Sequence, residues 1–275
     1  MKISIVDIGS NAVKYKIFNS QNYELLDYYR EPLRLGRDVF KDGSLSATTQ
    51  EKLINLLNKY QNIFKENGID DVKYIATSAV RDANNSDELL NKLENEGIDL
   101  KILTGKEEAS LLVELNENII NSAVIDIGGG SVEVCINKDS KMYYESFQLG
   151  AVRLLNMNEN EYKRSLSKFG DWLNKFKPIP ITYGLGGNLR ALMQANSVTG
   201  SIKVSELKSY INTYNKFDDR TLMEKFSIPK DRIDIVPLAA KIYLFFLLKL
   251  DANSIENSFF SISDGLVKKI VKEEL

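Results

Sequence analysis

Two segments of the chain share one arrangement of apolar and polar positions. Residues 6–17 read VDIGSNAVKYKI, and residues 125–136 read IDIGGGSVEVCI. In each segment an apolar run ends in Asp-Ile-Gly, and apolar residues then return at every second position, as in a β-strand. Each segment is therefore predicted to form a β-hairpin with a glycine-containing turn. A unit that occurs twice indicates two similar halves of the chain.

Strands and helices alternate along the rest of the sequence. Apolar spacing, glycine positions and a capping-box pattern predict the elements of the first half in this order: a helix at about 46–68, a strand at 72–76, a helix at 86–96, a strand at 98–103 and a helix from 104. The second half is predicted to begin with the second hairpin at 124–147. Helices near 159–176, a strand at 179–183 and further helices to the end are predicted to follow it. This alternation predicts an α/β fold. We place the domain boundary near Asn121, which gives domains at 1–121 and 122–275.

Composition and charge narrow the classes of partner. The 275 residues carry a net charge of only -2, so no global positive field attracts nucleic acid or an anionic membrane. The apolar run from Ile242 to Leu248 is too short to cross a bilayer and predicts a buried helix. The N-terminus enters a strand pattern without the features of a signal peptide. We therefore expect a cytoplasmic protein that binds neither nucleic acid nor membrane.

The chain has no histidine and one cysteine. The absence of histidine excludes histidine-based triads, histidine general bases and histidine-rich zinc sites. Cys135 lies in a strand-like segment, which favours a packed thiol over a nucleophile. Acid–base chemistry must therefore come from carboxylates, lysine, tyrosine or the cysteine.

Three glycine-containing turns follow apolar runs, at residues 7–11, 126–131 and 184–188. One such turn is most often only a tight turn, but three together favour a cradle for phosphate groups. We expect the glycines to adopt positive φ angles there and to bring backbone N–H groups close to a ligand. Two of the turns begin with an aspartate. Magnesium accepts few carboxylates beside water and phosphate oxygens, so Asp7 and Asp126 are candidate metal ligands.

Other charged residues stand near these turns. Glu133 follows on the returning strand of the second hairpin, where it either faces a ligand or lies on a solvent-exposed strand face. Its counterpart in the first hairpin, Lys14, is suited to contact phosphates. Glu108 is stabilised by the helix dipole whatever else it does, and it also has the right chemistry to deprotonate a water. Four arginines adjoin small-residue loops and are candidates for phosphate contacts: Arg34, Arg81, Arg153 and Arg190.

Six motifs in this order resemble the exopolyphosphatase and guanosine pentaphosphate phosphatase family: DIGSNAVKYKI, ATSAVRDANN, TGKEEASLL, VIDIGGGSVEV, LGAVRL and GLGGNLRAL. The resemblance covers nearly the whole chain. It implies the fold of the actin, sugar kinase and chaperone ATPase superfamily, with two ribonuclease-H-like domains flanking a phosphate-binding cleft. It also implies hydrolysis of a terminal phosphoanhydride bond in polyphosphate or guanosine pentaphosphate, with Mg²⁺ as cofactor.

Individual roles follow from the same resemblance. Glu108 matches the family's glutamate that activates water, and Asp126 and Glu133 match an acidic pair that handles magnesium and the terminal phosphate. Ser10, Asn11, Arg81 and residues 128–131 match phosphate-binding positions. The glycine turns and the charge pattern complete the expected set, which comprises Gly9, Ser10, Asn11, Lys14, Arg81, Gly128, Gly129, Gly130, Ser131, Gly186 and Gly187 for substrate, and Asp7, Asp126 and Glu133 for metal.

The sequence departs from the family pattern at four positions in the turns. Ala12, Val132 and Asn188 stand where hydroxyl residues are usual, and Lys14 stands where arginine is usual. An alternative function is therefore a protein that binds polyphosphate or a nucleotide alarmone without hydrolysing it. A kinase or actin-like ATPase is a weaker alternative, because the sequence shows no clear purine site. The resemblance is to short family members, for which short polyphosphates or nucleotides are expected, and a second copy of the chain is a candidate partner.

Overall fold

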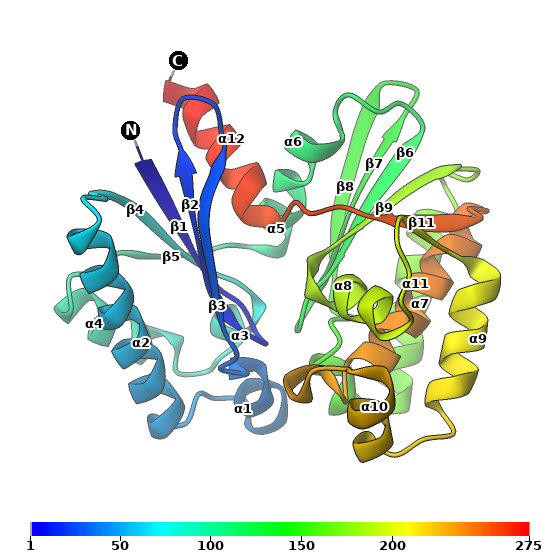
Figure 1. Cartoon of the computed structure of the whole chain (residues 1–275), viewed down its shortest axis with the longest axis horizontal. Helices are drawn as coiled ribbons and strands as arrows, with labels where there is room; N and C mark the ends of the chain where they lie inside the picture. Colours follow the sequence, from blue (N-terminus) through cyan, green and yellow to red (C-terminus); the bar gives the residue numbers. More distant parts are fainter. Residues whose placement is uncertain (1, 275) are drawn as a thin grey trace. The chain divides into compact units, whose positions relative to one another are not determined.

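A computed structural model describes residues 2–274 of the chain (Figure 1). Its residue contacts group into two compact units. The first unit comprises Met1–Glu108 and Ile262–Leu275, and the second comprises Ala109–Ser261. The sequence-based division at residue 121 placed residues 109–121 in the first domain and residues 262–275 in the second. The contacts group both segments the other way. For residues 262–275 the reason is that the last helix packs on the first sheet.

The first unit contains a five-stranded sheet. Its strands are β1 (Lys2–Ile8), β2 (Val13–Asn19), β3 (Leu25–Glu31), β4 (Asp71–Ala76) and β5 (Leu100–Ile102), in the spatial order β3-β2-β1-β4-β5. β1 and β2 pair antiparallel with Ile8 opposite Val13, which confirms the first predicted hairpin. β4 runs parallel to β1, and β5 runs parallel to β4. The carboxyl ends of these three parallel strands therefore meet at one edge of the sheet.

Helices cover both faces of this sheet (Figure 1). The helices of this unit are α1 (Leu35–Asp42), α2 (Ala47–Glu66), α3 (Ser78–Arg81), α4 (Ser86–Asn95) and the C-terminal α12 (Ile262–Glu274), together with the start of α5 (Gly105–Leu111), which ends in the second unit. α2 confirms the helix expected at 46–68. The Ser46 side chain caps its start by accepting a hydrogen bond from the backbone N–H of Thr49. Tyr60 of α2 packs edge-on against Tyr15 of β2, with 5.0 Å between the ring centroids. This aromatic contact anchors α2 to the first hairpin.

The second unit contains a six-stranded sheet. Its strands are β6 (Ser122–Ile127), β7 (Val132–Lys138), β8 (Lys141–Phe147), β9 (Ile181–Leu185), β10 (Ser201–Lys203) and β11 (Ser254–Asn257), in the spatial order β10-β11-β9-β6-β7-β8. Taken from β8, the order β8-β7-β6-β9-β11 repeats that of the first sheet, and β10 adds one antiparallel edge strand. The repeat seen in the sequence is therefore a repeat of sheet topology, as expected for two ribonuclease-H-like domains.

The helices of the second unit are α6 (Val113–Asn116), α7 (Glu159–Leu173), α8 (Gly186–Ala195), α9 (Val204–Tyr214), α10 (Asp219–Phe226) and α11 (Val236–Leu250). α11 confirms the buried helix expected around residues 242–248. The strand expected at 179–183 is wrong by two residues, since β9 begins at Ile181. The backbone N–H of Ile179 instead donates to the carbonyl oxygen of Leu250 at 2.9 Å, outside the sheet.

Candidate functional site

The turn of the first hairpin lies at the carboxyl ends of the parallel strands in the first unit. The backbone N–H of Gly9 donates to the carbonyl oxygen of Ala12 at 3.1 Å and closes the turn. Ser10 is buried, and its hydroxyl lies 2.9 Å from that of Ser78, at the start of α3. Asn11, also buried, accepts at its carbonyl oxygen a hydrogen bond from the backbone N–H of Arg34 at 3.1 Å. The turn is thus fixed by segments on either side of it.

Asp7 and Lys14 stand opposite each other on β1 and β2. The Lys14 ammonium donates to Asp7 Oδ2 at 2.9 Å, and the aspartate side chain is only 3% exposed. Asp7 Oδ1 is buried and has no hydrogen-bond partner among the described residues. A buried oxygen without a donor is costly, so Asp7 is suited to receive a cation or a water.

Arg81 and Glu108 form a charge pair in the first unit. The Arg81 Nη1 group donates to Glu108 Oε1 and also to the carbonyl oxygen of Leu103, the latter at 2.6 Å. Glu108 is 4% exposed, whereas its neighbour Glu107 is partly exposed and caps α5 through Thr104. The capping box expected at Thr104 and Glu107 is confirmed, and Glu108 has a separate, buried environment. The structure therefore brings together the two residues expected to activate water and to bind phosphate.

The turn of the second hairpin repeats the first. The backbone N–H of Gly128 donates to the carbonyl oxygen of Ser131 at 3.0 Å, as Gly9 does to Ala12. The segment after β8 holds the outer side of this turn. Its backbone N–H groups bond the carbonyl oxygens of Gly128 and Gly129, and Arg153 Nε donates to the carbonyl oxygen of Gly130 at 2.6 Å. Because the carbonyl groups are held on this side, the turn is a rigid candidate nest for an anion.

The backbone N–H groups of this turn strengthen that interpretation. Within residues 2–274, Gly129, Gly130 and Ser131 donate no backbone hydrogen bond to a protein acceptor. Ser131 is nevertheless only 3% exposed. Buried N–H groups are almost always paired, so these donors are available to a ligand oxygen.

The third glycine turn is a strand-to-helix junction. β9 ends at Leu185, opposite Asp126 of the parallel strand β6, and α8 begins at Gly186. A Cβ atom on Gly186 would lie 2.5 Å from Asp126 Oδ1. Asn188 is buried, and its Nδ2 group donates to the carbonyl oxygen of Ile127 at 2.8 Å. The second and third turns therefore lie together at one edge of the second sheet.

Arg232 is a residue at this junction that the sequence analysis missed. It ends the short 3-10 helix η2 (Lys230–Arg232), and its Nη1 group donates to Asn188 Oδ1 at 2.7 Å. A Cβ atom on Gly187 would collide with its guanidinium group. Its own segment has no glycine and no repeated pattern, so only the tertiary contact identifies it.

Of the four arginines considered from sequence, Arg34 and Arg153 contact the first and second turns.

Asp126 and Glu133 are cross-strand partners on β6 and β7, just as Asp7 and Lys14 are on β1 and β2. Glu133 is 3% exposed and accepts a hydrogen bond from the Ser146 hydroxyl at 2.8 Å. The alternative that Glu133 lies on a solvent-exposed strand face is therefore wrong. Each hairpin places one carboxylate and one further charged side chain side by side beneath its turn.

The glycines of the two hairpin turns do not adopt the expected positive φ angles; among the three turns only Gly186 does, at +82°. At Gly9 and Gly128, close approach of the turn's own backbone explains the glycine. A Cβ atom would lie 3.1 Å from the Ala12 carbonyl oxygen at Gly9, and 3.3 Å from the Ser131 carbonyl oxygen at Gly128. Glycine is thus favoured by packing of the turn against itself.

The residues fit a magnesium ion that is held mostly by water and phosphate. Among residues 2–274 no group of three or more metal-ligating side chains gathers in one place. Magnesium does not need such a group, since it usually keeps several waters and takes one or two carboxylates. The buried Asp7 Oδ1 atom without a hydrogen-bond donor meets that requirement within the first unit.

Gly186→Ala is expected to destabilise the second unit by about 1–3 kcal/mol more than Gly200→Ala does. Both glycines have similar positive φ angles, +82° and +84°, so the backbone cost of alanine is shared. Only at Gly186 would the new methyl group meet Asp126, because Gly200 has no neighbour within 4 Å. Thermal denaturation of the two variants measures the difference. Equal melting temperatures would show that Asp126 is not held against the junction.

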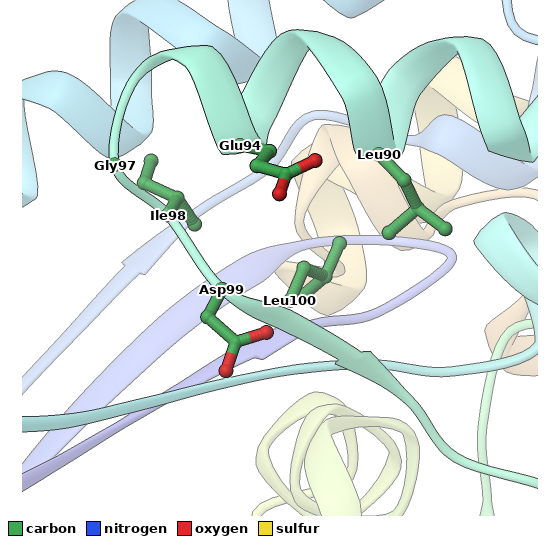
Figure 2. A pocket seen from close by; sticks show the side chains of 6 residues that line it. All are labelled: Leu90, Glu94, Gly97, Ile98, Asp99 and Leu100. Atoms are coloured by element: carbon green, nitrogen blue, oxygen red, sulfur yellow. The ribbon is translucent and has the colours of Figure 1, made fainter.

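A hollow of about 440 Å³ lies between α4 and β5 in the first unit (Figure 2). Its lining combines the side chains of Leu90, Ile98 and Leu100 with two carboxylates, Glu94 and Asp99. None of the candidate site residues lines it. Two carboxylates repel phosphate, so this hollow is not part of the candidate site.

Two further expectations from sequence can be compared with the structure. Cys135 is fully buried, and burial raises the pKa of its thiol to about 12. It is a packed thiol and not a nucleophile, as expected.

Among the residues that the structure describes, no helix has both the length and the apolar character needed to cross a membrane.

Comparison of the sequence with known proteins gives consistent matches. The model of the Ppx/GppA phosphatase family matches residues 18–274. Exopolyphosphatase 1 of Mycobacterium bovis is 28% identical over 190 residues, covering 63% of this chain and 54% of that protein. Guanosine-5'-triphosphate,3'-diphosphate pyrophosphatase of Aeromonas hydrophila is 22% identical over an alignment of 289 positions, which covers 95% of this chain and 58% of that protein. The chain thus spans little more than half the length of these two relatives.

Solved structures show the same fold over almost the whole chain. A Ppx/GppA family member from Aquifex aeolicus is 25% identical with a TM-score of 0.78, covering 100% of this chain and 99% of that one. An exopolyphosphatase from Cytophaga hutchinsonii is 21% identical with a TM-score of 0.87, covering 99% and 98%. These likenesses confirm the expected actin-like α/β fold.

Proposed function

Because the chain belongs to the Ppx/GppA phosphatase family, we propose that it hydrolyses the terminal phosphoanhydride bond of inorganic polyphosphate or guanosine pentaphosphate. Relatives named for each activity match the chain, one as an exopolyphosphatase and one as a guanosine pentaphosphate pyrophosphatase. The observation that carries most weight is the buried Glu108 paired with Arg81 in the first unit. It places a carboxylate base beside a guanidinium suited to a phosphate.

Glu108 is the proposed general base. The chain has no histidine, so a carboxylate is the natural acceptor for a proton from water. The water oxygen attacks the terminal phosphorus as its proton passes to Glu108 Oε1 or Oε2. The bond from phosphorus to the bridging oxygen breaks, and its electron pair leaves with the shortened chain. Arg81, which holds Glu108 in place, offers positive charge to the transferred group.

The glycine turns are the proposed phosphate cradle. The unpartnered backbone donors at residues 129–131 support this role in the second unit. In the first unit the buried Ser10 hydroxyl and Lys14 support it, with Gly9 and Asn11 shaping the turn. Gly186 and Gly187 adjoin the second turn. Phosphoryl transfer is mostly positioning and charge stabilisation, which such groups provide.

Magnesium is the proposed cofactor, with Asp7 as its candidate ligand in the first unit and Asp126 and Glu133 as its candidate ligands in the second. When bound, it neutralises charge on the phosphate oxygens. Asp7 offers Oδ1 while Lys14 occupies Oδ2. A cytoplasmic location and a homodimer stay predictions from the sequence.

One observation favours the alternative of a binding protein that does not hydrolyse its ligand. Asn188, which stands where the family pattern usually has threonine, is fully engaged with the Ile127 carbonyl oxygen and with Arg232. Asparagine has no hydroxyl group to offer a substrate, and here both the nitrogen and the oxygen of its amide already bond to protein groups. The buried carboxylates Glu108 and Glu133 favour hydrolysis, because an ion-binding protein has less use for buried negative charge near a polyanion.

Phosphate release from a panel of substrates tests the proposal. Tripolyphosphate, long-chain polyphosphate, guanosine pentaphosphate and ATP are each incubated with the protein and Mg²⁺. We expect release from at least one of the first three, and loss of at least 90% of the rate, roughly a tenfold change, when EDTA removes the metal. Release unaffected by EDTA would contradict the metal role. Tight binding without release would favour the binding protein.

A further inference from the structure

The peptide group between Ile127 and Gly128 leads into the second glycine turn. Its N–H, on Gly128, donates to the carbonyl oxygen of Ser131 and closes the turn. Its carbonyl oxygen, on Ile127, accepts a hydrogen bond from Asn188 Nδ2 at 2.8 Å. A peptide group is planar, so a contact that holds its oxygen also fixes the direction of its N–H. Asn188 therefore holds the turn from outside.

The first glycine turn holds the corresponding peptide group with backbone alone. This group lies between Ile8 and Gly9, and the Ile8 carbonyl oxygen accepts a hydrogen bond from the backbone N–H of Thr77 at 3.2 Å. Thr77 directly follows β4, the strand that runs parallel to β1. The direction of a backbone N–H is set by its own peptide plane. The first turn therefore needs no further side chain to orient its donor.

The second sheet uses a side chain for the same task. β9 pairs with β6 as far as Leu185, opposite Asp126, and α8 begins at the next residue. The donor to the Ile127 carbonyl oxygen comes from Asn188, in the first turn of this helix. A side-chain amide can present either its nitrogen or its oxygen to a neighbour, and only the nitrogen donates. The reversed amide would place two oxygens against each other.

Arg232 sets the direction of this amide. Its Nη1 group donates to Asn188 Oδ1 at 2.7 Å. A guanidinium group has donors and no acceptor, so it binds the oxygen of the amide and leaves the nitrogen for the Ile127 carbonyl oxygen. The position of the guanidinium group depends on Gly187, because any Cβ atom there would collide with it.

The start of α8 also contacts Asp126, the residue before Ile127. A Cβ atom on Gly186 would lie 2.5 Å from Asp126 Oδ1, so the backbone of this glycine packs closely against the carboxylate. The first turn of α8 thus bears on a candidate metal ligand and on the peptide group that leads into the candidate phosphate turn. A shift of Asn188 would move both of these neighbours.

From these contacts we infer that Arg232 is a positioning residue for the phosphate-binding turn of the second unit. It orients Asn188, which holds the peptide group between Ile127 and Gly128, and this group sets the direction of the backbone donors at residues 129–131. The inference rests on the proposed function, which assigns these donors to phosphate. It also gives Asn188 a role of its own at a position where threonine is usual. Small displacements of positioning groups are costly in phosphoryl transfer.

Hydrogen exchange of the glycine amides tests the positioning without any ligand or turnover. Protein with isotope-labelled glycine is compared by NMR as the parent, Arg232→Met and Arg232→Lys. Methionine removes every donor, whereas lysine keeps a donor at a similar length. Arg232→Met is expected to speed exchange of the Gly128 amide about tenfold and that of the Gly9 amide less than about twofold. Arg232→Lys should retain most of the protection at Gly128.

A double-mutant cycle tests whether Arg232 acts through Asn188. Asn188→Ala removes the bridge, so adding Arg232→Met to it should speed Gly128 exchange by less than about twofold more. Effects of other contacts of Arg232 occur in both arms of the cycle and cancel. Arg220→Gln is the control, since this arginine of α10 lies in the same unit and its side chain is 80% exposed. It should change neither glycine amide.

Two results would overturn the inference. Additive losses in the cycle would show that Arg232 does not act through Asn188. An equal rise in exchange at Gly9 and Gly128 would show a general loosening of the protein and no specific effect on the second turn. Circular dichroism and melting temperature verify that each variant is folded.

Phosphate binding and turnover separate this inference from the proposed function. Imidodiphosphate, whose P–N–P link resists hydrolysis, is titrated with Mg²⁺ by calorimetry, and Arg232→Met is expected to bind it about tenfold more weakly than the parent. Unchanged binding would overturn the positioning role. A parent that binds imidodiphosphate through Arg232 but hydrolyses no substrate would keep that role and contradict the hydrolase. A parent that hydrolyses tripolyphosphate, with kcat and KM unaltered in Arg232→Met, would do the reverse.

Discussion

Glu108→Gln is expected to lower kcat for phosphate release by about 10²–10⁴-fold, the usual contribution of a positioned general base. Glutamine has the same shape as glutamate, so it fills the same buried space and still accepts a hydrogen bond from Arg81. It has no carboxylate to take the proton of the attacking water. The measurement is the initial rate at saturating substrate, compared with the parent under the same magnesium concentration.

Substrate affinity provides a second readout for the same variant. Arg81 is paired with a negative charge in the parent, and the glutamine removes that charge. Its guanidinium then interacts more strongly with phosphate, so KM is expected to fall or to stay unchanged. A general loss of structure would raise KM and lower kcat together. A rate within tenfold of the parent would contradict the assignment of Glu108.

Glu107→Gln is the matched control, because it removes the neighbouring carboxylate on the same helix. Glu107 accepts hydrogen bonds from the backbone N–H and the hydroxyl of Thr104, and the first of these is the main cause that lowers its pKa. Because folding lowers the pKa of Glu107, its carboxylate stabilises the protein at pH values above the pKa that it has in the unfolded chain. This stabilisation is lost as the pH falls through the pKa of the folded state. The partly exposed site limits the cost of the substitution to below about 1 kcal/mol. Its kcat should match the parent.

Asp264→Asn is expected to lower the stability of the first unit by about 3–5 kcal/mol. Lys16 and Asp264 are 248 positions apart in sequence, and their charged atoms lie 2.6 Å apart with both side chains about nine-tenths buried. Removing the carboxylate takes away the negative charge that faces the buried Lys16 ammonium. Because this pair joins α12 to β2, the loss should appear first as faster hydrogen exchange in residues 262–274.

A double variant distinguishes a broken charge pair from poor packing. Lys16→Met combined with Asp264→Leu replaces both charges by apolar groups, and it should recover most of the stability lost in Asp264→Asn. Glu159→Gln is the control, since it breaks a Lys163 ion pair of the same 2.6 Å length that is largely exposed. That change should cost less than about 1 kcal/mol. Equal losses for Asp264→Asn and Glu159→Gln would contradict the buried-pair argument.

Much of the fold was predictable because its signals are local. Alternating apolar residues predicted both hairpins, and apolar spacing with Ser46 at the start predicted α2. Short-range patterns failed where distant segments decide the structure. The start of β9 is one such case, because Ile179 pairs with the end of α11 and not with the sheet. The grouping of α12 with the first unit is another, since its packing partner lies at the other end of the chain.

The candidate site shows the same division. The repeat of an aspartate before each turn, and of a charged residue seven positions later, was visible in the sequence and is fixed by hairpin register. The sequence by itself thus determined which strands form the two hairpins, where their turns fall and which charged residues stand beneath the turns. Only the tertiary structure decided that Arg81 meets Glu108 and that Arg232 meets Asn188. These contacts depend on packing between distant segments, for which no local sequence pattern exists.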